Sequence, residues 1–315
     1  MLSINDILVA RDFSSVSDRA LRHALDLAAR TGATLHLLHA DVLHEVEDRT
    51  GEGGAPGDDV AAFREQLKAD GTTDPDALDA VTVREVTRRD VAPAPALLNY
   101  VDDEGIDLIA LGTHGRTGPS RVLLGSVAEE VVRRARQPVL TVRGKDKGRT
   151  PTPGQIDRLL VPVDFSTYAR EALRVAHEWA ALYDATIDVL HVVEEDLHPT
   201  FYVGGVTSIY DVEPDLDDKV NAKLQEFVAE VLGSADGVET HVRTGSAPSG
   251  ITEFVEEHEV DLVALSTHGR TGLERFFLGS VAEKVVRHVT CPVLTTKAFG
   301  TSLAAPEAEA VGEEA

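Results

Sequence analysis

The chain has 315 residues, of which 43% are hydrophobic, and its 54 acidic and 30 basic side chains give a formal net charge of −24. So acidic a chain disfavours binding to nucleic acid or to anionic membranes, which both attract basic patches. No apolar run approaches the roughly 18 residues that a membrane-spanning helix needs. Only seven of the basic residues are lysine, and this composition predicts a halophilic protein, with an acidic mesophilic protein as the alternative.

The N-terminal residues and the single cysteine bear on the cellular compartment. The chain runs directly into a predicted strand, without a basic segment and an apolar core, so no secretion signal is expected. One cysteine, Cys291, rules out an intrachain disulfide framework and favours a reducing, cytoplasmic location. Beside Pro292 at the start of a strand, Cys291 is expected to fill space in the core rather than to react.

The first half of the chain alternates short apolar strands with helices. Strands are predicted over 7–12, 34–42, 81–87, 107–111 and 139–142, and helices over 18–31, 60–69, 94–104 and 127–134. The continuous apolar character of 34–42 indicates burial on both faces, as in a parallel sheet. Residues 44–59 contain four glycines and a proline and predict a flexible insertion.

The second half repeats the first at an offset of 152 to 154 residues. Residues 113–141 and 267–295 share 20 of 29 residues in ungapped register. Further strands are predicted over 159–164, 186–193, 238–243 and 262–265, and helices over 167–183, 217–232 and 247–257. This order predicts an α/β fold of two tandem, doubly wound, five-stranded parallel-sheet domains of the Rossmann-like type. Domain 1 is placed at 1–143, a linker at 144–156, domain 2 at 157–298 and an acidic disordered tail at 299–315.

A glycine-punctuated loop separates the strand at 107–111 from the following helix. Glycines there let backbone N–H groups close on a bound group, and the helix N-terminus adds unpaired N–H groups and a positive dipole end. The pattern predicts a phosphate-binding loop. Alternatively, Ser126 with Glu129, and Ser280 with Glu283, form a capping box that merely starts a helix. Capping does not account for the other glycines, or for the arginines at 116, 121, 270 and 275, which place positive charge in an acidic chain.

An aspartate ends the first predicted strand of each half. Asp12 and Asp164 are expected beside the glycine loop of their own half, because open α/β sheets bind ligands beyond the carboxyl ends of their strands. A carboxylate there commonly accepts hydrogen bonds from ribose hydroxyls, which indicates a nucleotide. The alternative is an aspartate that is solvated or caps a helix.

Histidines occur near both features. His114 and His268 lie between the glycines, where each could polarise a phosphate or respond to pH, although a hydrogen-bonding wall residue is the simpler role. His36, His39 and His44 do not predict a metal site, because residues 36 and 39 of one strand face opposite sides.

The spacing Gly112-x-x-Gly115, nine residues, then Gly125-Ser126 resembles the ATP-binding signature of the universal stress protein family, G-x2-G-x9-G-[S/T]. The resemblance covers residues 4 to about 297 and includes Asp-Phe-Ser after the first strand of each half. It implies an adenine nucleotide alpha hydrolase-like fold and ATP, with Mg²⁺, as the ligand. It also implies that the strands at 139–142 and 293–296 pair within one chain. Further homo-oligomerisation is left open, and protein partners are unknown.

The resemblance also implies which residues line the two pockets. Those of the first half are Asp12, Ala40, Gly112, His114, Gly115, Gly125, Ser126 and Val127, and those of the second are Asp164, Val192, His268, Gly269, Gly279, Ser280 and Val281. Arg116 and Arg270 are added for their charge, and Ser266 because it occupies the position of Gly112. The glycine is expected to permit unusual backbone angles and close approach of the ligand, so the second pocket is expected to bind ATP more weakly.

Two kinds of function remain for such a chain. The first is a noncatalytic stress-response protein that binds ATP and signals to partners. The second is an enzyme that hydrolyses ATP or transfers an adenylyl group. Against the enzyme, there is no Walker A pattern, no lysine between Lys68 and Lys145, and no catalytic triad or carboxylate pair that recurs in both halves. Slow hydrolysis is compatible with the first function. A structural member of the family that binds no nucleotide is a third alternative.

Overall fold

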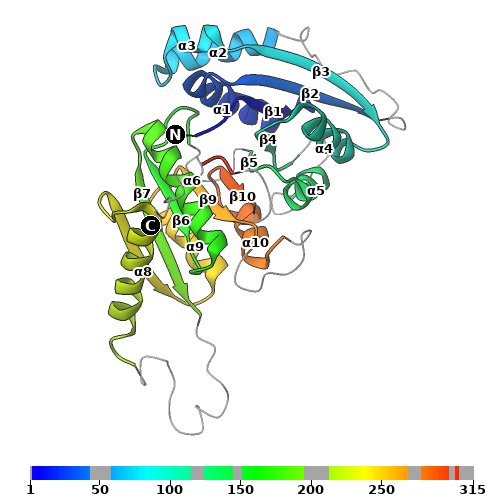
Figure 1. The fold of residues 1–315 in the computed structure, drawn as a ribbon. Coiled ribbons are helices and arrows are strands. Elements are labelled where there is room, and N and C mark those ends of the chain that lie inside the picture. Colours follow the sequence, from blue (N-terminus) through cyan, green and yellow to red (C-terminus); the bar gives the residue numbers. More distant parts are fainter. Residues whose placement is uncertain are drawn as a thin grey trace, which may run out of the picture.

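The two halves of the chain build one sheet. A computed structural model describes residues 2–42, 58–114, 124–144, 151–194, 213–268, 278–297 and 302–304. Its ten strands lie in the order β3-β2-β1-β4-β5-β10-β9-β6-β7-β8, and the first five strands belong to domain 1 (Figure 1). Within the described residues, no helix has both the length and the apolar character needed to cross a membrane.

The elements of the two domains follow one another in the same order. Domain 1 contains β1 (Asp6–Ala10), α1 (Ser15–Thr31), β2 (Thr34–Val42), α2 (Asp58–Asp70), α3 (Pro75–Ala80), β3 (Val83–Asp90), α4 (Pro93–Glu104), β4 (Leu108–Gly112), α5 (Ser126–Arg134) and β5 (Val139–Val142). Domain 2 contains β6 (Arg158–Pro162), α6 (Thr167–Tyr183), β7 (Thr186–Val193), α8 (Leu216–Leu232), β8 (Val238–Thr244), α9 (Ala247–Glu257), β9 (Leu262–Ser266), α10 (Ser280–His288) and β10 (Val293–Thr296).

Strands run parallel within each domain and antiparallel where the domains meet. At the joint, Thr141 of β5 lies opposite Val293 of β10, and Val139 lies opposite Thr295. The two threonine hydroxyls each donate to the backbone carbonyl across the joint, at 3.2 Å. This confirms the predicted doubly wound domains and the intrachain pairing of their last strands, which removes two sheet edges from solvent.

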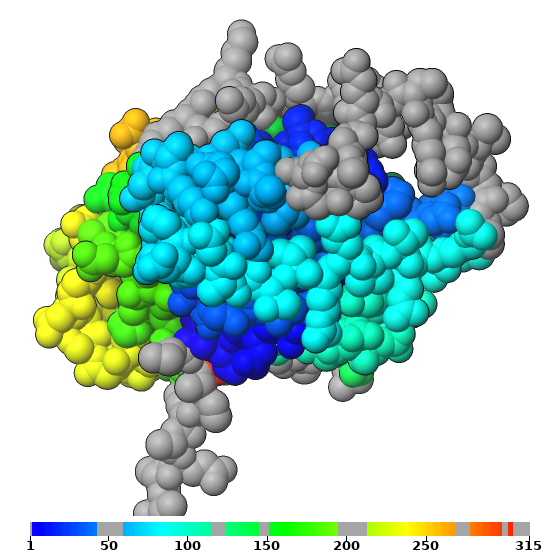
Figure 2. Space-filling model, turned by 90° about the horizontal axis from the view of Figure 1, so that it is seen from above, coloured from blue at the N-terminus to red at the C-terminus, as the bar shows by residue number. Residues whose placement is uncertain are grey.

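Helices cover both faces of the sheet and produce two cores. One core packs under α1, α2, α3, α6 and α8, and includes the fully buried Trp179. The other packs under α4, α5, α9 and α10 and contains Cys291, whose pKa burial raises to about 12. The expectation that this cysteine fills space in the core is confirmed. Figure 2 shows the cyan surface of α2 and α3 bordering the green and yellow surface of domain 2.

A buried polar group joins α1 of domain 1 to α6 of domain 2. Asp26, 1% exposed, accepts hydrogen bonds at Oδ1 from Arg30 Nε (2.9 Å) and Thr73 Oγ1 (2.6 Å), and at Oδ2 from the Tyr183 hydroxyl (2.6 Å). The Arg30 guanidinium also lies 4.3 Å from the centre of the Tyr183 ring, and it donates to the carbonyl of Gly154 at 3.3 Å. The Asp26 carboxylate therefore connects α1 to α6 directly, and it connects α1 to the linker through Arg30.

Basic residues after β5 and β10 make reciprocal contacts across the domain joint. Arg143 Nη1 donates to the carbonyl oxygen of Arg287 at 2.6 Å, at the end of α10. Lys297 Nζ donates to the carbonyl oxygen of Val132, near the end of α5. Each cation thus meets the unpaired carbonyls and the negative dipole end of a helix in the other domain.

Lys297 gives the domain joint a predicted pH dependence. Burial lowers its pKa from 10.5 to about 7, so between these values the unfolded chain binds more protons and stability rises with pH. We expect the wild type to gain about 2 kcal/mol relative to Lys297→Met between pH 7 and pH 9. Urea unfolding at both pH values measures this difference. Exposed Lys284→Met, on α10, is the control, and an equal response of wild type and Lys297→Met would contradict the assignment.

Several predicted boundaries need correction. The first strands end at Ala10 and Pro162, before the aspartates, and α3 was not predicted at all. The prediction of a disordered tail is wrong for residues 302–304. Leu303 is fully buried in the core, and its carbonyl oxygen accepts a hydrogen bond from Ser3 N at 3.0 Å. Several predicted segments lie outside the described residues. They are most of the insertion at 44–59, residues 145–150 of the linker, and residues 299–301 and 305–315 of the tail.

Candidate functional site

The strand ends and helix starts that flank each glycine loop are held together. After β4, the carbonyl of Thr113 accepts a hydrogen bond from Gly125 N at 2.7 Å, and after β9 that of Thr267 accepts from Gly279 N at 2.9 Å. Each loop is therefore closed at its base in both domains. Residues 115–123 and 269–277 of the loops, with Gly115, Arg116, Gly269 and Arg270, lie outside the described residues.

Gly125 and Gly279 are required by close packing at these closure points. A Cβ atom on Gly125 would lie 3.0 Å from the Thr113 carbonyl oxygen, and one on Gly279 would lie 3.1 Å from that of Thr267. Both distances are tighter than most Cβ contacts in proteins. These glycines therefore allow the helix N-terminus to lie against the end of the strand. The phosphate-binding site was predicted at this position.

The start of each following helix differs from the predicted capping box. Gly125 and Gly279 are the N-caps, so Ser126 and Ser280 are the first helical residues, and neither helix has a side-chain cap hydrogen bond among the described residues. The capping-box alternative is wrong because the glycine takes the N-cap position. The N–H groups at the start of α5 and α10 are consequently not used by a capping side chain.

The unusual backbone angles predicted for Gly112 are not found, while close approach of a ligand to this glycine stays a prediction. Its φ angle is not in the left-handed region, and a Cβ there would lie 2.8 Å from Cγ1 of Val16 in the first turn of α1. The glycine therefore allows α1 to approach β4. In domain 2, Ser266 accepts a hydrogen bond at Oγ from His268 N, at 3.2 Å, and Tyr168 occupies the position of Val16.

The aspartates lie in a strained turn after the first strand of each domain. Asp12 Oδ1 accepts from Ser14 N (3.0 Å) and Ser14 Oγ (2.6 Å), and Asp164 Oδ1 accepts from Ser166 N (3.0 Å). The intervening Phe13 and Phe165 have φ angles of 61° and 62°, a left-handed conformation that disfavours side chains with a Cβ. One carboxylate oxygen of each aspartate thus holds the serine that caps α1 or α6. The aspartates do not cap the helices themselves, because Ser14 and Ser166 are the N-caps.

The histidines are oriented by their buried neighbours. The hydroxyl of Thr113 lies 3.0 Å from Nδ1 of His114, and that of Thr267 lies 3.1 Å from Nδ1 of His268. This is the contact expected of a hydrogen-bonding wall residue. The remaining predicted lining residues are half-buried apolar side chains packed on the second core, namely Ala40, Val127, Val192 and Val281.

Known proteins match both halves of the chain. The model of the universal stress protein family matches residues 3–143 and again residues 155–297. The chain belongs to the universal stress protein family. A relative from Methanocaldococcus jannaschii is 34% identical over 144 residues, which is 44% of this chain and 81% of the relative.

Solved structures of the family share the tandem fold. A universal stress protein from Pseudomonas aeruginosa has a TM-score of 0.63 and 20% identity, and the match covers 94% of both chains. One from Archaeoglobus fulgidus has a TM-score of 0.59 and 21% identity, covering 93% of this chain and 96% of that chain. These similarities show that the present universal stress protein has the family's fold in both halves.

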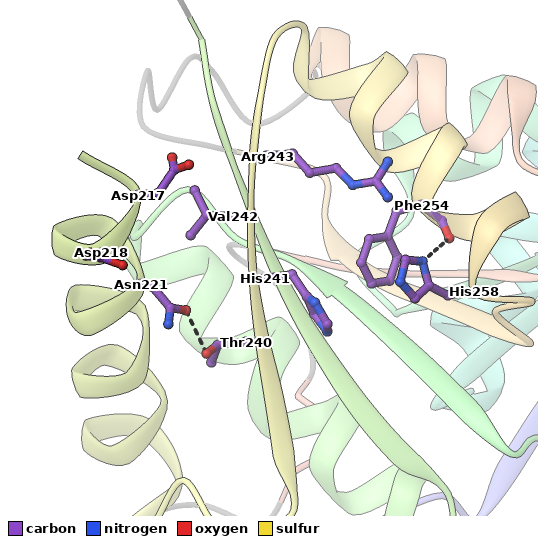
Figure 3. Close-up of a pocket in the computed structure, with 9 residues that line it drawn as sticks. All are labelled: Asp217, Asp218, Asn221, Thr240, His241, Val242, Arg243, Phe254 and His258. Carbon is purple, nitrogen blue, oxygen red and sulfur yellow. Dashed lines mark hydrogen bonds between the residues drawn. The ribbon is translucent and has the colours of Figure 1, made fainter. Parts of the chain in front are cut away.

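A surface pocket lies at the outer edge strand β8, three strands from β9 in the order of the sheet (Figure 3). Its volume is about 410 Å³. The ring of His258 stacks on Phe254 with centroids 3.8 Å apart, and the Arg243 guanidinium lies 5.0 Å from the Phe254 centroid. The full lining is Asp217, Asp218, Asn221, Thr240, His241, Val242, Arg243, Phe254 and His258. No sequence pattern predicted this pocket, because its residues come from two helices and one strand.

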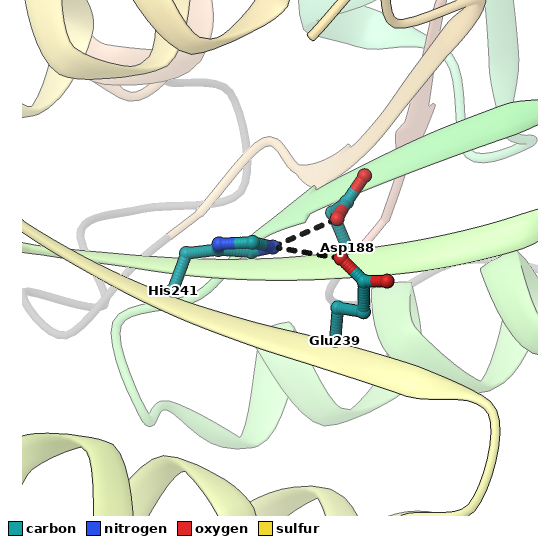
Figure 4. A group of neighbouring side chains, drawn as sticks. All are labelled: Asp188, Glu239 and His241. Carbon is teal, nitrogen blue, oxygen red and sulfur yellow. Dashed lines mark hydrogen bonds and ion pairs between the residues drawn. The ribbon is translucent and has the colours of Figure 1, made fainter.

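Three potential metal ligands meet nearby, on β7 and β8 (Figure 4). They are Asp188, Glu239 and His241, whose ligand atoms all lie within 4.8 Å of one another. His241 Nε2 lies 2.8 Å from Asp188 Oδ1 and 3.8 Å from Glu239, while Arg158 Nε lies 3.2 Å from Asp188 Oδ2. Both oxygens of the buried Asp188 carboxylate are thus paired within the protein.

In domain 1 the position of Asp188 is taken by His36. Its Nε2 atom lies 2.9 Å from Asp6 Oδ1, and its Nδ1 atom lies 2.7 Å from the Tyr100 hydroxyl.

Proposed function

We propose that this universal stress protein binds ATP, together with Mg²⁺, at the glycine loop of each domain. We further propose that it acts in the cytoplasm as a noncatalytic stress-response module. The observation that carries the proposal is the closure of each loop onto a glycine N-cap, which leaves the N-terminus of α5 and of α10 without a capping side chain. Exposed N–H groups and the positive end of a helix dipole favour a phosphate there.

The neighbouring residues provide for the rest of a nucleotide. Asp12 and Asp164 lie just after the first strand of each domain, where a carboxylate can accept hydrogen bonds from ribose hydroxyls. Half-buried Ala40 and Val127, with Val192 and Val281 in domain 2, offer apolar surface for a base. Mg²⁺ would arrive with the triphosphate, whose oxygens and bound waters are its usual ligands. No described side chain is assigned to the ion.

The absence of a catalytic arrangement in the sequence favours binding over turnover. No lysine occurs between Lys68 and Lys145, so no ammonium group from this stretch can neutralise a transferring phosphoryl group. Mass spectrometry of nucleotide released by denaturing freshly purified protein tests the identity of the ligand, and ATP is expected. Stimulated turnover above about 1 per second would instead favour the ATP-hydrolysing or adenylyl-transferring enzyme.

The two pockets are expected to differ in affinity. In domain 2, the backbone N–H of His268 is directed to Ser266 Oγ, whereas a glycine at the matching position of domain 1 has no such acceptor. We expect the second site to bind ATP several-fold more weakly, a difference of about 1 kcal/mol. Calorimetry on Ser266→Gly, at the same salt concentration as wild type, should show a tighter second site. A second site that weakens instead would identify Ser266 as a ligand contact.

A further inference from the structure

Two cationic side chains of α1 have no ion-pair partner among the residues that the structure describes. Arg19 is 7% exposed, and its Nη1 atom is buried without a hydrogen-bond partner in the structure as described. One turn further on, Nε of Arg22 is also buried and unpartnered, and its guanidinium lies 5.4 Å from the centre of the Phe63 ring. Adjacent His23 is 5% exposed, and its Nε2 atom is likewise unpartnered.

The charges of these three groups are well defined at neutral pH. Burial, and then the proximity of Arg22, lower the pKa of Arg19, but a guanidinium stays protonated in proteins. Burial lowers the pKa of His23 to about 3, with further contributions from Arg19 and Arg22. The cluster therefore carries two positive charges and one neutral imidazole that can donate a single N–H.

Three carboxylates of α1 and α2, all among the described residues, are bonded elsewhere. Asp18 lies 3.2 Å from Arg11 Nη1, and Asp59 of α2 lies 3.1 Å from Arg11 Nη2. Asp18 also attracts Arg22 at longer range, but its ion pair is with Arg11. Asp26, one turn beyond Arg22, is occupied by Arg30, Thr73 and Tyr183. A buried charge without a counter-charge is strongly destabilising.

In domain 2, the equivalent helix α6 has an acidic side chain beside its arginine. At the offset of 152, Glu171 of α6 takes the position of Arg19, and Arg174 takes that of Arg22. Glu171 Oε2 lies 3.9 Å from Arg174 Nη1. The helix of domain 2 therefore supplies an internal anion at the point where the helix of domain 1 supplies a second cation.

We propose that Arg19, Arg22 and His23 form a binding site for a small inorganic anion of the halide class, with chloride as the ligand. Residues 19, 22 and 23 lie on one face of α1 because of their helical spacing, and the atoms Arg19 Nη1, Arg22 Nε and His23 Nε2 are buried without a hydrogen-bond partner among the described residues. The two guanidinium groups, with His23 in the tautomer protonated at Nε2, can all donate to one bound anion. A monovalent halide suits so buried a place because the cost of removing an ion from water rises steeply with its charge. The bound ion would offset one of the two positive charges on α1, in a chain that otherwise carries an excess of acid.

The test compares the thermal stability of the full chain in sodium chloride and in sodium gluconate at equal ionic strength, so that screening is matched. We expect wild type to melt about 2–4 °C higher in chloride. Well-hydrated anions generally stabilise proteins more than chloride does, so this difference is opposite to the general salt effect. Arg19→Met should lose the chloride-specific shift, while Arg174→Met, the matched change in α6, should keep it. Equal melting of wild type in both salts, or a shift retained in Arg19→Met, would overturn the proposal.

Anomalous diffraction from wild-type crystals grown in sodium bromide provides a second readout that does not depend on a variant folding. A bromine peak within hydrogen-bonding distance of the Arg19 guanidinium is expected. A map with ordered Arg19 and Arg22 side chains and no such peak would contradict the site.

Discussion

Replacing Asp26 by alanine is expected to lower the free energy of unfolding by about 3–5 kcal/mol, the range measured when one partner of a buried ion pair is removed. The carboxylate is 1% exposed and accepts from Arg30, Thr73 and Tyr183. Its loss leaves the Arg30 charge without its anion and two buried hydroxyls without an acceptor. Because Tyr183 belongs to α6, the change also loosens the contact between the domains.

Urea unfolding of Asp26→Ala, Tyr183→Phe and the double variant measures this contribution. We expect Tyr183→Phe to be less destabilising in the Asp26→Ala background than in wild type, because both changes remove the same hydrogen bond between Tyr183 and Asp26. Glu230→Ala breaks an exposed ion pair with Arg170, at 2.7 Å, and should change stability by less than about 1 kcal/mol. If Asp26→Ala is no more destabilising than this control, the carboxylate does not hold the two helices together.

Gly112→Ser is expected to destabilise domain 1 by about 1–3 kcal/mol, the usual range for overpacking a core contact. The new Cβ would lie 2.8 Å from Val16 Cγ1 and 3.2 Å from the Val16 carbonyl carbon, so the first turn of α1 must move away from β4. Ser266→Gly makes the reverse change in domain 2 and should leave stability within about 1 kcal/mol of wild type.

A second substitution separates steric crowding from other causes. Val16→Ala removes the Cγ1 atom that meets the new side chain, so it should restore part of the stability lost in Gly112→Ser. The recovery should be partial because the backbone carbon of Val16 would still lie 3.2 Å from the new Cβ atom. Thermal unfolding of the single and double variants measures the effect, and independent, additive losses would show that Val16 is not the obstacle.

The order of the elements, apart from α3, could be predicted from the sequence, and the family resemblance implied the pairing of the domains. Apolar periodicity located the strands, and the duplication placed β5 and β10 at equivalent positions, so that their pairing closes both sheet edges. The glycine spacing located both candidate sites, because the reason for Gly125 and Gly279 is local: a helix begins against the end of the preceding strand.

Features that depend on contacts between distant elements were not predicted. The role of Gly112 is set by Val16, almost a hundred residues earlier in the chain. The burial of Leu303 depends on the N-terminal segment that it meets. The capping-box alternative was wrong for a related reason. The spacing of Ser126 and Glu129 does not show that Gly125, rather than Ser126, is the N-cap residue. Side-chain periodicity carries no information on such pairings.

The most direct test of the central claim is calorimetric titration of the full chain with ATP and Mg²⁺, using one variant for each loop. Gly125→Val and Gly279→Val place a branched side chain where even a Cβ atom meets the strand-end carbonyl at 3.0 or 3.1 Å. Wild type should bind two ATP molecules, the tighter with micromolar affinity, or about 8 kcal/mol. Each variant should retain one site, with the other domain's affinity unchanged, and the double variant should bind none. An absence of binding to wild type, or two sites remaining in the folded double variant, would contradict the assignment of ATP to the glycine loops.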